Sequence, residues 1–254
     1  MKIHVITYAT HSFGLYNELI ENNRDIITIG WGKKWNGFTD KLIYINKYLH
    51  NYIDDKDIVV IVDGFDTKII KDLETVKRRF LQFNCKVLLS KDYNGTNPFI
   101  KYLKKKVFKE CHKNITINSG LFMGYARELK LVFNHILNKE KKCKDDQRLL
   151  NVACSSFNFI EIDEKNEVFE NFFLHSDTKN LRSNACILGF PGLIHINRCH
   201  RALREYAQFF IFELLLIFIL LFIVFNNNNI IKTILFCALI YIISISDTSC
   251  IRNH

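Results

Sequence analysis

The sequence has few residues that break regular structure and no paired cysteines of the kind that bind zinc. Only two prolines and ten glycines occur in 254 residues, which excludes a disordered or collagen-like chain. None of the eight cysteines belongs to a Cys-x-x-Cys pair, so we expect no structural zinc site. Most of them lie in apolar or helical contexts and are predicted to be plain buried or free thiols, which fits a reducing compartment.

What is abundant is apolar sequence and positive charge. Hydrophobic residues make up 48% of the chain and 22 residues are phenylalanine, which predicts one sizeable domain with an apolar core and an appendage. The formal net charge of +9 would suit nucleic acid or an anionic membrane surface. The lysines, however, are spread along predicted helices without interleaved aromatic residues or a nucleic-acid module. We therefore interpret the charge as a solvated basic surface and expect no nucleic-acid partner.

A run of β-branched apolar residues, 58–62, ends in two carboxylates, Asp63 and Asp66. Such a run predicts a strand buried on both faces at the centre of a mostly parallel sheet. Ligands of open α/β sheets bind beyond the carboxyl ends of the strands, where these carboxylates fall. Two carboxylates three residues apart around Gly64 suit a hard divalent cation that also binds substrate phosphates. Asp and Gly are also ordinary turn residues, so the motif alone leaves both interpretations open.

Predicted strands and helices alternate along residues 1–204. The strands are expected at residues 2–8, 26–30, 58–62, 86–90, 115–124, 159–162 and 193–196. The helices are expected at residues 13–22, 39–52, 72–83, 98–111, 127–138 and 148–155. This alternation predicts βαβ units and hence an α/β fold with a mostly parallel central sheet.

Three polar features interrupt these elements. Residues 118–120, Asn-Ser-Gly, lie inside an apolar strand and indicate either a close ligand or a β-bulge. Asp145 and Asp146 open a helix, where acidic residues are favoured by the helix dipole, so capping explains them without a function. His195 lies in a late strand, where a lone histidine is usually structural.

The composition changes from residue 209 onward. Two apolar stretches, residues 209–225 and 230–246, are separated by a run of asparagines, and each is near the ~17-residue lower limit for crossing a bilayer. Continuous Leu, Ile and Phe leave no polar face for water, which favours membrane over a pair of buried helices. Residues 205–254 are thus predicted to be a transmembrane helical hairpin, with Glu213 and Lys232 near the helix ends or paired.

The charges that flank the hairpin predict its orientation. Both flanks are basic, which by the positive-inside rule places the preceding domain and the extreme C-terminus on the cytoplasmic side. The residues concerned are Arg198, Arg201, Arg204 and Arg252. No charged region followed by an apolar core and a small-residue cleavage site occurs at the start, so no signal peptide is predicted.

A series of short motifs follows the order of one known family. They are residues 4–10 (HVITYAT), 30–32 (GWG), 35–37 (WNG), Lys41, 62–66 (VDGFD), 88–90 (LLS), 118–124 (NSGLFMG), 145–147 (DDQ), 163–169 and His195. Over residues 2–204 the chain resembles the glycosyltransferase domain of the procollagen-lysine hydroxylases, related to the family 25 procollagen galactosyltransferases. The resemblance implies a GT-A fold, a Rossmann-like α/β sheet that binds a UDP-sugar with Mn²⁺.

The resemblance also implies roles for individual residues on the donor side. Asp63, Asp66 and His195 would bind the metal, and Thr7 and Tyr44 would lie near the uridine. The family commonly has Trp at the position of Tyr44, and stacking should survive that change. After His195 the family usually continues Gly-Asn-Gly-Pro, whereas this chain has Ile-Asn-Arg. We expect the arginine of this segment, at position 198, to contribute a phosphate contact.

On the acceptor side, the resemblance implies that Asn118, Asp145 and Asp146 face the transferred sugar or the acceptor. We expect Asp146 to be the carboxylate that orients the acceptor hydroxyl or takes its proton. The predicted function is metal-dependent transfer of a hexose from a UDP-sugar to a hydroxyl acceptor, on a collagen-like or other protein or on a glycan. The alternative is a catalytically silent GT-A module that acts as a membrane-tethered binding protein.

Overall fold

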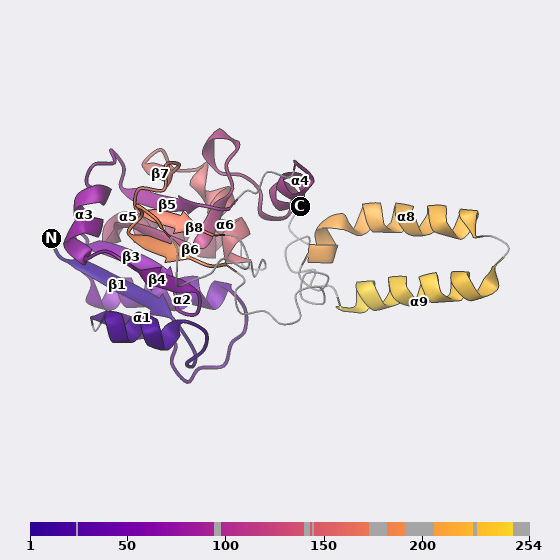
Figure 1. Cartoon of the computed structure of the whole chain (residues 1–254), viewed down its shortest axis with the longest axis horizontal. Coiled ribbons are helices and arrows are strands. Elements are labelled where there is room, and N and C mark those ends of the chain that lie inside the picture. Colours follow the sequence, from indigo (N-terminus) through magenta and orange to yellow (C-terminus); the bar gives the residue numbers. More distant parts are fainter. Residues whose placement is uncertain are drawn as a thin grey trace. The chain divides into compact units, whose positions relative to one another are not determined.

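The computed structural model describes residues 1–23, 25–93, 98–139, 143, 145–172, 182–191, 206–225 and 228–245. The chain divides into two compact units, Met1–Ile194 and His195–His254 (Figure 1). The domain boundary predicted near residue 204 lies outside the described residues and stays a prediction.

A six-stranded sheet forms the centre of the first unit, in the order β2-β1-β3-β6-β5-β7. The strands are β1 (Ile3–Tyr8), β2 (Ile26–Ile29), β3 (Ile58–Asp63), β5 (Val87–Lys91), β6 (Ile117–Tyr125) and β7 (Ile160–Asp163). β6 runs antiparallel to both of its neighbours, while the other pairings are parallel. The sheet is therefore mixed, with β6 as the single reversed strand among those described. β3 lies between β1 and β6 and is buried from Ile58 to Val62, which confirms the prediction of a central strand.

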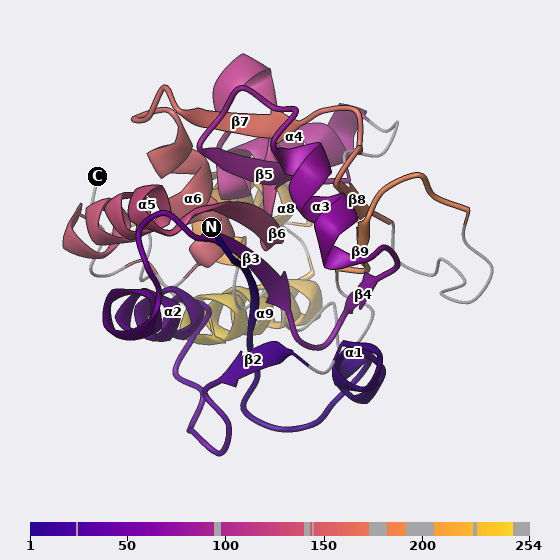
Figure 2. The same ribbon diagram turned by 90° about the vertical axis from the view of Figure 1, so that its left-hand side faces the viewer.

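Helices lie on both faces of this sheet. The described helices of the first unit are α1 (Tyr16–Asn22), α2 (Thr39–Tyr52), α3 (Leu73–Phe80), α4 (Pro98–Phe108), α5 (Ala126–Lys139), α6 (Asp146–Cys154) and the 3₁₀ helix η1 (His112–Asn114). α2 and α5 lie side by side on one face (Figure 2). The apolar side of α2, with Leu42 and Ile45, is fully buried there, as its helical spacing predicts. The Phe122 ring of β6 packs edge-on against Phe133 of α5 with centroids 6.0 Å apart.

A second, smaller sheet covers the opposite face together with α1 and α3 (Figure 2). It has the order β4-β9-β8, formed by β4 (Thr67–Ile69), β8 (Phe169–Asn171) and β9 (Ile187–Gly189). Its apolar residues share a core with Val60 and Met123 of the large sheet. These strands were not predicted, because three residues are too few to show an alternating pattern.

Asp163 shapes the loop that joins the two sheets. Its carboxylate accepts hydrogen bonds from the backbone N–H groups of Glu167, Val168 and Phe169 at 2.8, 2.7 and 2.8 Å. Burial of this side chain raises the pKa of Asp163, against the opposing effect of the three N–H groups. The segment 163–169, part of the family resemblance, is thus a structural turn.

One local prediction needed correction, and another could not be tested. The segment 115–124 is not an interrupted strand, because β6 continues through residues 118–120. Its pairing with β5 instead jumps between Leu89, which faces Phe122, and Ser90, which faces Asn118. The register shift agrees with the β-bulge alternative, and it lies at the edge of the sheet where a ligand was also predicted. The strand predicted at residues 193–196 lies outside the described residues.

The cysteines also differ from expectation. Cys111, at the end of the α4 segment, and Cys154, the last residue of α6, are joined as a disulfide. The prediction of free thiols is wrong for this pair, because 43 residues separate them and only the packing of α4 on α6 brings them together. Cys85 and Cys186 are buried free thiols, as predicted, and Cys237 is free and exposed.

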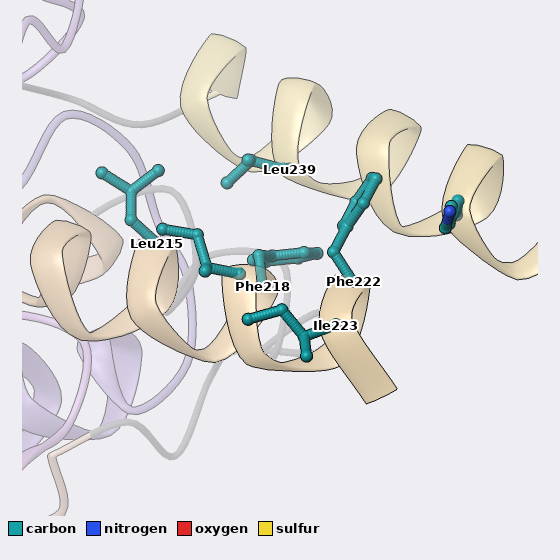
Figure 3. Close-up of a pocket in the computed structure, with 7 residues that line it drawn as sticks. Leu215, Phe218, Phe222, Ile223 and Leu239 are labelled. Carbon is teal, nitrogen blue, oxygen red and sulfur yellow. The ribbon is translucent and has the colours of Figure 1, made fainter. Parts of the chain in front are cut away.

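The second unit contains two apolar helices, α8 (Ile211–Val224) and α9 (Asn229–Ile245), preceded by a 3₁₀ turn, η2 (Ala207–Phe210). The helix Ala207–Val224 is long and apolar enough to cross a membrane, with mean hydropathy 2.8, and Asn229–Ser244 is a shorter apolar helix. α8 and α9 pack on each other and line an open pocket of about 560 Å³ (Figure 3). Its lining is apolar except for Lys232. By length and composition alone, these features are compatible with a membrane anchor.

Candidate active site at the carboxyl edge of the sheet

Four strands bring polar residues to one edge of the large sheet. β1 ends at Thr7 and Tyr8, β3 ends at Asp63, and β5 ends near Ser90. Because β6 is antiparallel to β3 and β5, its first residues, including Asn118, lie at this same edge. The fold therefore gathers most of the predicted site residues where α/β sheets bind ligands.

Two glycines allow the site residues to approach one another. A Cβ at Gly120 would lie 2.7 Å from Oδ2 of Asp63 and 2.8 Å from Oδ1 of Asn118, so only glycine fits between them. The Gly120 N–H donates to Oδ1 of Asn118 at 2.7 Å. A Cβ at Gly64 would likewise lie 2.9 Å from Oγ1 of Thr7. Asp63 thus lies beside Asn118, and Thr7 beside the acidic motif.

Thr7 has an unusual environment for a hydroxyl. Its side chain is fully buried, yet its Oγ1 has no hydrogen-bond partner among the described residues. Buried polar atoms normally find a partner, and an unpaired one is costly unless a ligand or water supplies the bond. This atom is therefore suited to meet a ligand at the strand end.

Asp66 lies beyond the strand, in the turn that leads to β4. Its backbone carbonyl accepts a hydrogen bond from the Phe190 N–H at 2.8 Å, just past β9. This bond ties the acidic motif to the end of the small sheet. His195 and Arg198, which follow in the sequence, lie outside the described residues.

Lys41 of α2 connects the two halves of the site and was given no role by the sequence. Its Nζ donates to Oδ1 of Asp63 at 2.9 Å and to the Ser119 carbonyl at 2.9 Å, and lies 2.7 Å from Oδ2 of Asp146. Burial alone would lower the pKa of Lys41, but the carboxylates of Asp146 and Asp63 raise it above its ordinary value. The ammonium is therefore charged and holds the two carboxylates close together.

A pattern in α2 could have revealed this residue. Lys41 lies four positions before Ile45, on the same helix face, which faces the core. A lysine on the buried face of an amphipathic helix needs a buried anionic partner. The partner is not visible in the sequence, because it comes from a distant helix.

The adjacent carboxylates Asp145 and Asp146 have different environments. Asp145 caps α6, its Oδ1 accepting a hydrogen bond from the Arg148 N–H at 2.8 Å, as the capping interpretation predicts. Asp146 is the first residue of the helix, is 4% exposed and pairs with Lys41. Of the two, Asp146 belongs to the cluster around Asp63.

Aromatic side chains line the neighbouring part of the edge. The Tyr44 ring stacks on Tyr8 with centroids 5.8 Å apart and an interplanar angle of 15°, and Trp35 lies 5.9 Å from Tyr8. The ammonium of Lys33 lies over the Tyr44 ring, 5.1 Å from its centroid. Burial, with smaller contributions from Asp40 and Tyr44, raises the pKa of Tyr8 to about 12. The sequence pointed to Tyr44 alone, and the fold adds Tyr8 and Trp35.

The acidic residues of the site fit a hard divalent cation. The Asp63 side chain is 40% exposed, and among the described residues only Lys41 binds it, through Oδ1. Its other oxygen, Oδ2, lies close to Gly120 and can bind a cation. Asp66 follows Asp63 three residues later in the sequence. Carboxylate oxygens are the ligands that Mg²⁺ and Mn²⁺ prefer.

An α/β unit with an acidic motif and clustered aromatic side chains at the carboxyl edge of its sheet belongs to the broad class of α/β domains that bind ligands beyond the strand ends. The chain matches the family described as the PLOD GT domain over residues 1–187. It therefore belongs to this family of glycosyltransferase domains, and the resemblance drawn from its motifs is confirmed.

Two relatives illustrate the extent of the match. The multifunctional procollagen lysine hydroxylase and glycosyltransferase of Caenorhabditis elegans is 28% identical over 193 residues, covering 69% of this chain and 24% of that protein. The uncharacterized protein R699 of Acanthamoeba polyphaga mimivirus is 27% identical over 206 residues, covering 74% of this chain and 43% of that protein. The chain thus spans less than half the length of either relative.

Solved glycosyltransferase structures are also similar. The bifunctional glycosyltransferase WbbM has a TM-score of 0.47 at 12% identity, with coverage of 75% of this chain and 46% of that chain. Mouse xyloside xylosyltransferase 1 has a TM-score of 0.45 at 9% identity, with coverage of 77% and 100%. The galactosyltransferase LgtC has a TM-score of 0.41 at 14% identity, with coverage of 74% and 87%. These scores are low, and the assignment rests on the family match.

Proposed function

We propose that this glycosyltransferase domain moves a hexose from a UDP-sugar to a hydroxyl acceptor with the help of Mn²⁺. The observation that carries the proposal is the ammonium of Lys41, which lies 2.9 Å from Asp63 and 2.7 Å from Asp146. Asp63 was predicted to contact the metal and the diphosphate, and Asp146 was predicted to face the sugar and the acceptor. Their convergence supports a single reaction centre.

The donor nucleotide is proposed to lie along the aromatic side chains Tyr8, Trp35 and Tyr44. A uracil ring can stack on Tyr44, whose partner Tyr8 holds it in place. The unpaired Oγ1 of Thr7 supplies a hydrogen-bonding group at the same strand end. Arg198 is proposed to contact the diphosphate, for which a guanidinium is well suited.

Asp63, Asp66 and His195 are proposed to hold the metal ion. Asp63 offers Oδ2, and a histidine beside two carboxylates suits Mn²⁺ better than Ca²⁺. When bound, a divalent ion offsets the charge that develops on the UDP leaving group. In the sequence His195 follows Phe190, whose N–H binds the Asp66 carbonyl, by five residues.

On the opposite side of the sugar, Asp146 is proposed to orient the acceptor hydroxyl and take its proton or stabilise positive charge on the sugar ring. Lys41 fixes the position of this carboxylate, and Asp145 fixes the start of α6 by capping it. Asn118, whose Oδ1 is held by the Gly120 N–H, is proposed to contact the sugar. The acceptor is proposed to be a hydroxyl on a collagen-like or other protein or on a glycan.

The second unit is proposed to anchor the enzyme in a lipid bilayer through both α8 and α9. The continuous apolar character of the two helices supports this, since many large apolar side chains are exposed on them. The arginines that flank the hairpin support a cytoplasmic position for the catalytic unit.

A catalytically silent binding module is the second candidate. The observation that favours it is the position of Lys41, because its ammonium already neutralises the Asp63 carboxylate that would bind the metal. Such a module would bind the nucleotide sugar without turnover. Binding and turnover must therefore be measured separately.

The test is release of UDP from a panel of UDP-sugars by the full-length chain in detergent, with Mn²⁺ and with EDTA. We expect metal-dependent release from one donor, and a loss on the order of 10²-fold or more in Asp63→Asn. Asp54→Asn is the matched control, because Asp54 is exposed and precedes the opposite end of β3. UDP binding without release would support the silent module, and neither binding nor release would contradict both candidates.

A further inference from the structure

A cluster of metal-binding side chains lies away from the site described above. It consists of Cys111, His112 and Cys154, whose ligand atoms all lie within 4.8 Å of one another. Among the described residues, no other group of three or more His, Cys, Asp or Glu side chains meets this criterion. The absence of a Cys-x-x-Cys pair predicted no structural zinc site, but the fold brings the ligands together from two distant segments.

The surroundings of the cluster suit a structural metal ion. Cys111 is 8% exposed and Cys154 is 0% exposed, so both sulfurs are shielded from water. The His112 ring is half-buried, and its Nε2 faces the Phe157 carbonyl at 3.4 Å. A histidine that binds a metal through one ring nitrogen usually directs the other to a carbonyl or carboxylate.

We propose that the reduced forms of Cys111 and Cys154, together with His112, bind a zinc-class cation. Two thiolates and an imidazole select Zn²⁺ and its soft relatives over the hard Mn²⁺ proposed for the carboxylate site. This inference is independent of the transferase reaction.

The structure joins the two sulfurs to each other, so metal binding requires that this bond first open. Two molecules of a low-molecular-weight thiol supply the two electrons and two protons and become one disulfide, leaving Cys111 and Cys154 as thiols. Metal binding then releases the two thiol protons. The cytoplasmic position proposed for this unit is one in which such thiols stay reduced.

The spacing of the two cysteines suits both arrangements. On a tetrahedral ion with Zn–S bonds of about 2.3 Å, two sulfurs lie about 3.8 Å apart. The Cα atoms of Cys111 and Cys154 are 5.4 Å apart, close enough for both sulfurs to reach one ion. The ion would fasten η1 to the end of α6, whose other end carries Asp146. Metal binding should therefore stabilise the helix on which the candidate active site depends.

The test uses the full-length chain, reduced with a phosphine, freed of metal and titrated with Co²⁺. We expect a thiolate-to-cobalt charge-transfer band in the near ultraviolet and the intense visible bands of tetrahedral Co²⁺, both removed by added Zn²⁺. The carboxylate site cannot produce the thiolate band. Because this measurement is made on the unaltered protein, it does not depend on whether a variant folds.

Variants locate the site. Cys111→Ser and Cys154→Ser should lose the thiolate band, and His112→Ala should weaken Co²⁺ binding by more than about tenfold, since even outer partners of metal ligands are worth that much. The matched controls are Cys85→Ser, a buried thiol elsewhere, and His135→Ala, whose ring packs on Phe157 outside the cluster. These should bind Co²⁺ normally.

Two results would overturn the proposal. One is a reduced protein, with both thiols detected by titration, that shows no thiolate band. The other is a protein isolated from cells under non-oxidising conditions that contains no zinc and still has Cys111 bonded to Cys154. That second result would establish the pair as a permanent disulfide.

Discussion

The ammonium of Lys41 lies 2.7 Å from Oδ2 of Asp146, the first residue of α6. Both side chains are buried, with exposed fractions of 7% and 6%. The same ammonium binds Asp63 at the end of β3 and the carbonyl of Ser119 in β6. Lys41 therefore links the end of β3, the start of β6 and the start of α6 within the candidate site.

Replacing Lys41 by methionine should impair both stability and activity. The variant keeps the volume of the side chain but leaves the buried Asp146 carboxylate without its counter-charge. Removing one partner of a buried ion pair costs about 3–5 kcal/mol, and the lower end applies here because Asp63 is partly exposed. Urea unfolding measures the first effect, and UDP release measures the second.

Lys47→Met is the matched control, since Lys47 lies on the exposed side of the same helix. It should unfold within about 0.5 kcal/mol of the unaltered protein. If Lys41→Met were as stable and as active as this control, the ammonium would have neither a structural nor a positioning role.

The parts of the fold that the sequence predicted are those encoded locally. The run Ile58–Val62 could be placed at the centre of the sheet because every residue in it is apolar and β-branched. The capping role of Asp145 could be predicted because an N-cap acts on N–H groups two or three residues away. Asp63 and Asp66 could be singled out because they directly follow such a strand.

The parts that the sequence did not predict depend on contacts between distant segments. The pairing of Lys41 with Asp146 joins two helices that are far apart in the chain, and the bond between Cys111 and Cys154 joins two others. The reversed direction of β6 also has no local signal, because an antiparallel strand buried on both faces is as apolar as a parallel one. Without it, Asn118 could not have been placed beside Asp63.

Tyr44→Ala should weaken nucleotide binding more than it weakens the fold. Stacking of a base on an aromatic side chain is worth about 1–3 kcal/mol, so the dissociation constant for UDP should rise roughly tenfold or more. Tyr44→Trp should bind nearly as well as the unaltered protein. Tyr52→Ala is the control, because Tyr52 is 70% exposed on the same helix. If calorimetry gave equal UDP affinities for the Tyr44→Ala and Tyr52→Ala variants, the base would not stack on Tyr44.

Substitutions of Gly30 and Gly32 test whether the position of the Tyr8 ring matters for UDP binding. Both have positive φ, +90° and +73°, so alanine at either position should cost about 1 kcal/mol of backbone strain. A Cβ at Gly30 would also lie 2.4 Å from the ring of Tyr8, whereas one at Gly32 meets no atom within 4 Å. Gly30→Ala should therefore lose a further 1–3 kcal/mol or so from overpacking and should also weaken UDP binding. Thermal unfolding and UDP titration that gave the same result for both variants would show that Tyr8 is not held by this contact.

Asp163 should make the stability of the catalytic unit depend on pH. Burial raises the pKa of this carboxyl in the folded protein, so its stabilising contribution is full below the pKa of the unfolded chain. That contribution is lost as the pH rises through the pKa of the folded protein, because a buried carboxylate must then carry charge.

The variant Asp163→Asn cannot titrate at this position, so its deficit in unfolding free energy relative to the unaltered protein should shrink over the same pH range. Denaturant unfolding at a series of pH values, followed by the fluorescence of Trp31 and Trp35, measures this difference. A deficit of Asp163→Asn that grew with pH would mean that the backbone N–H groups outweigh burial.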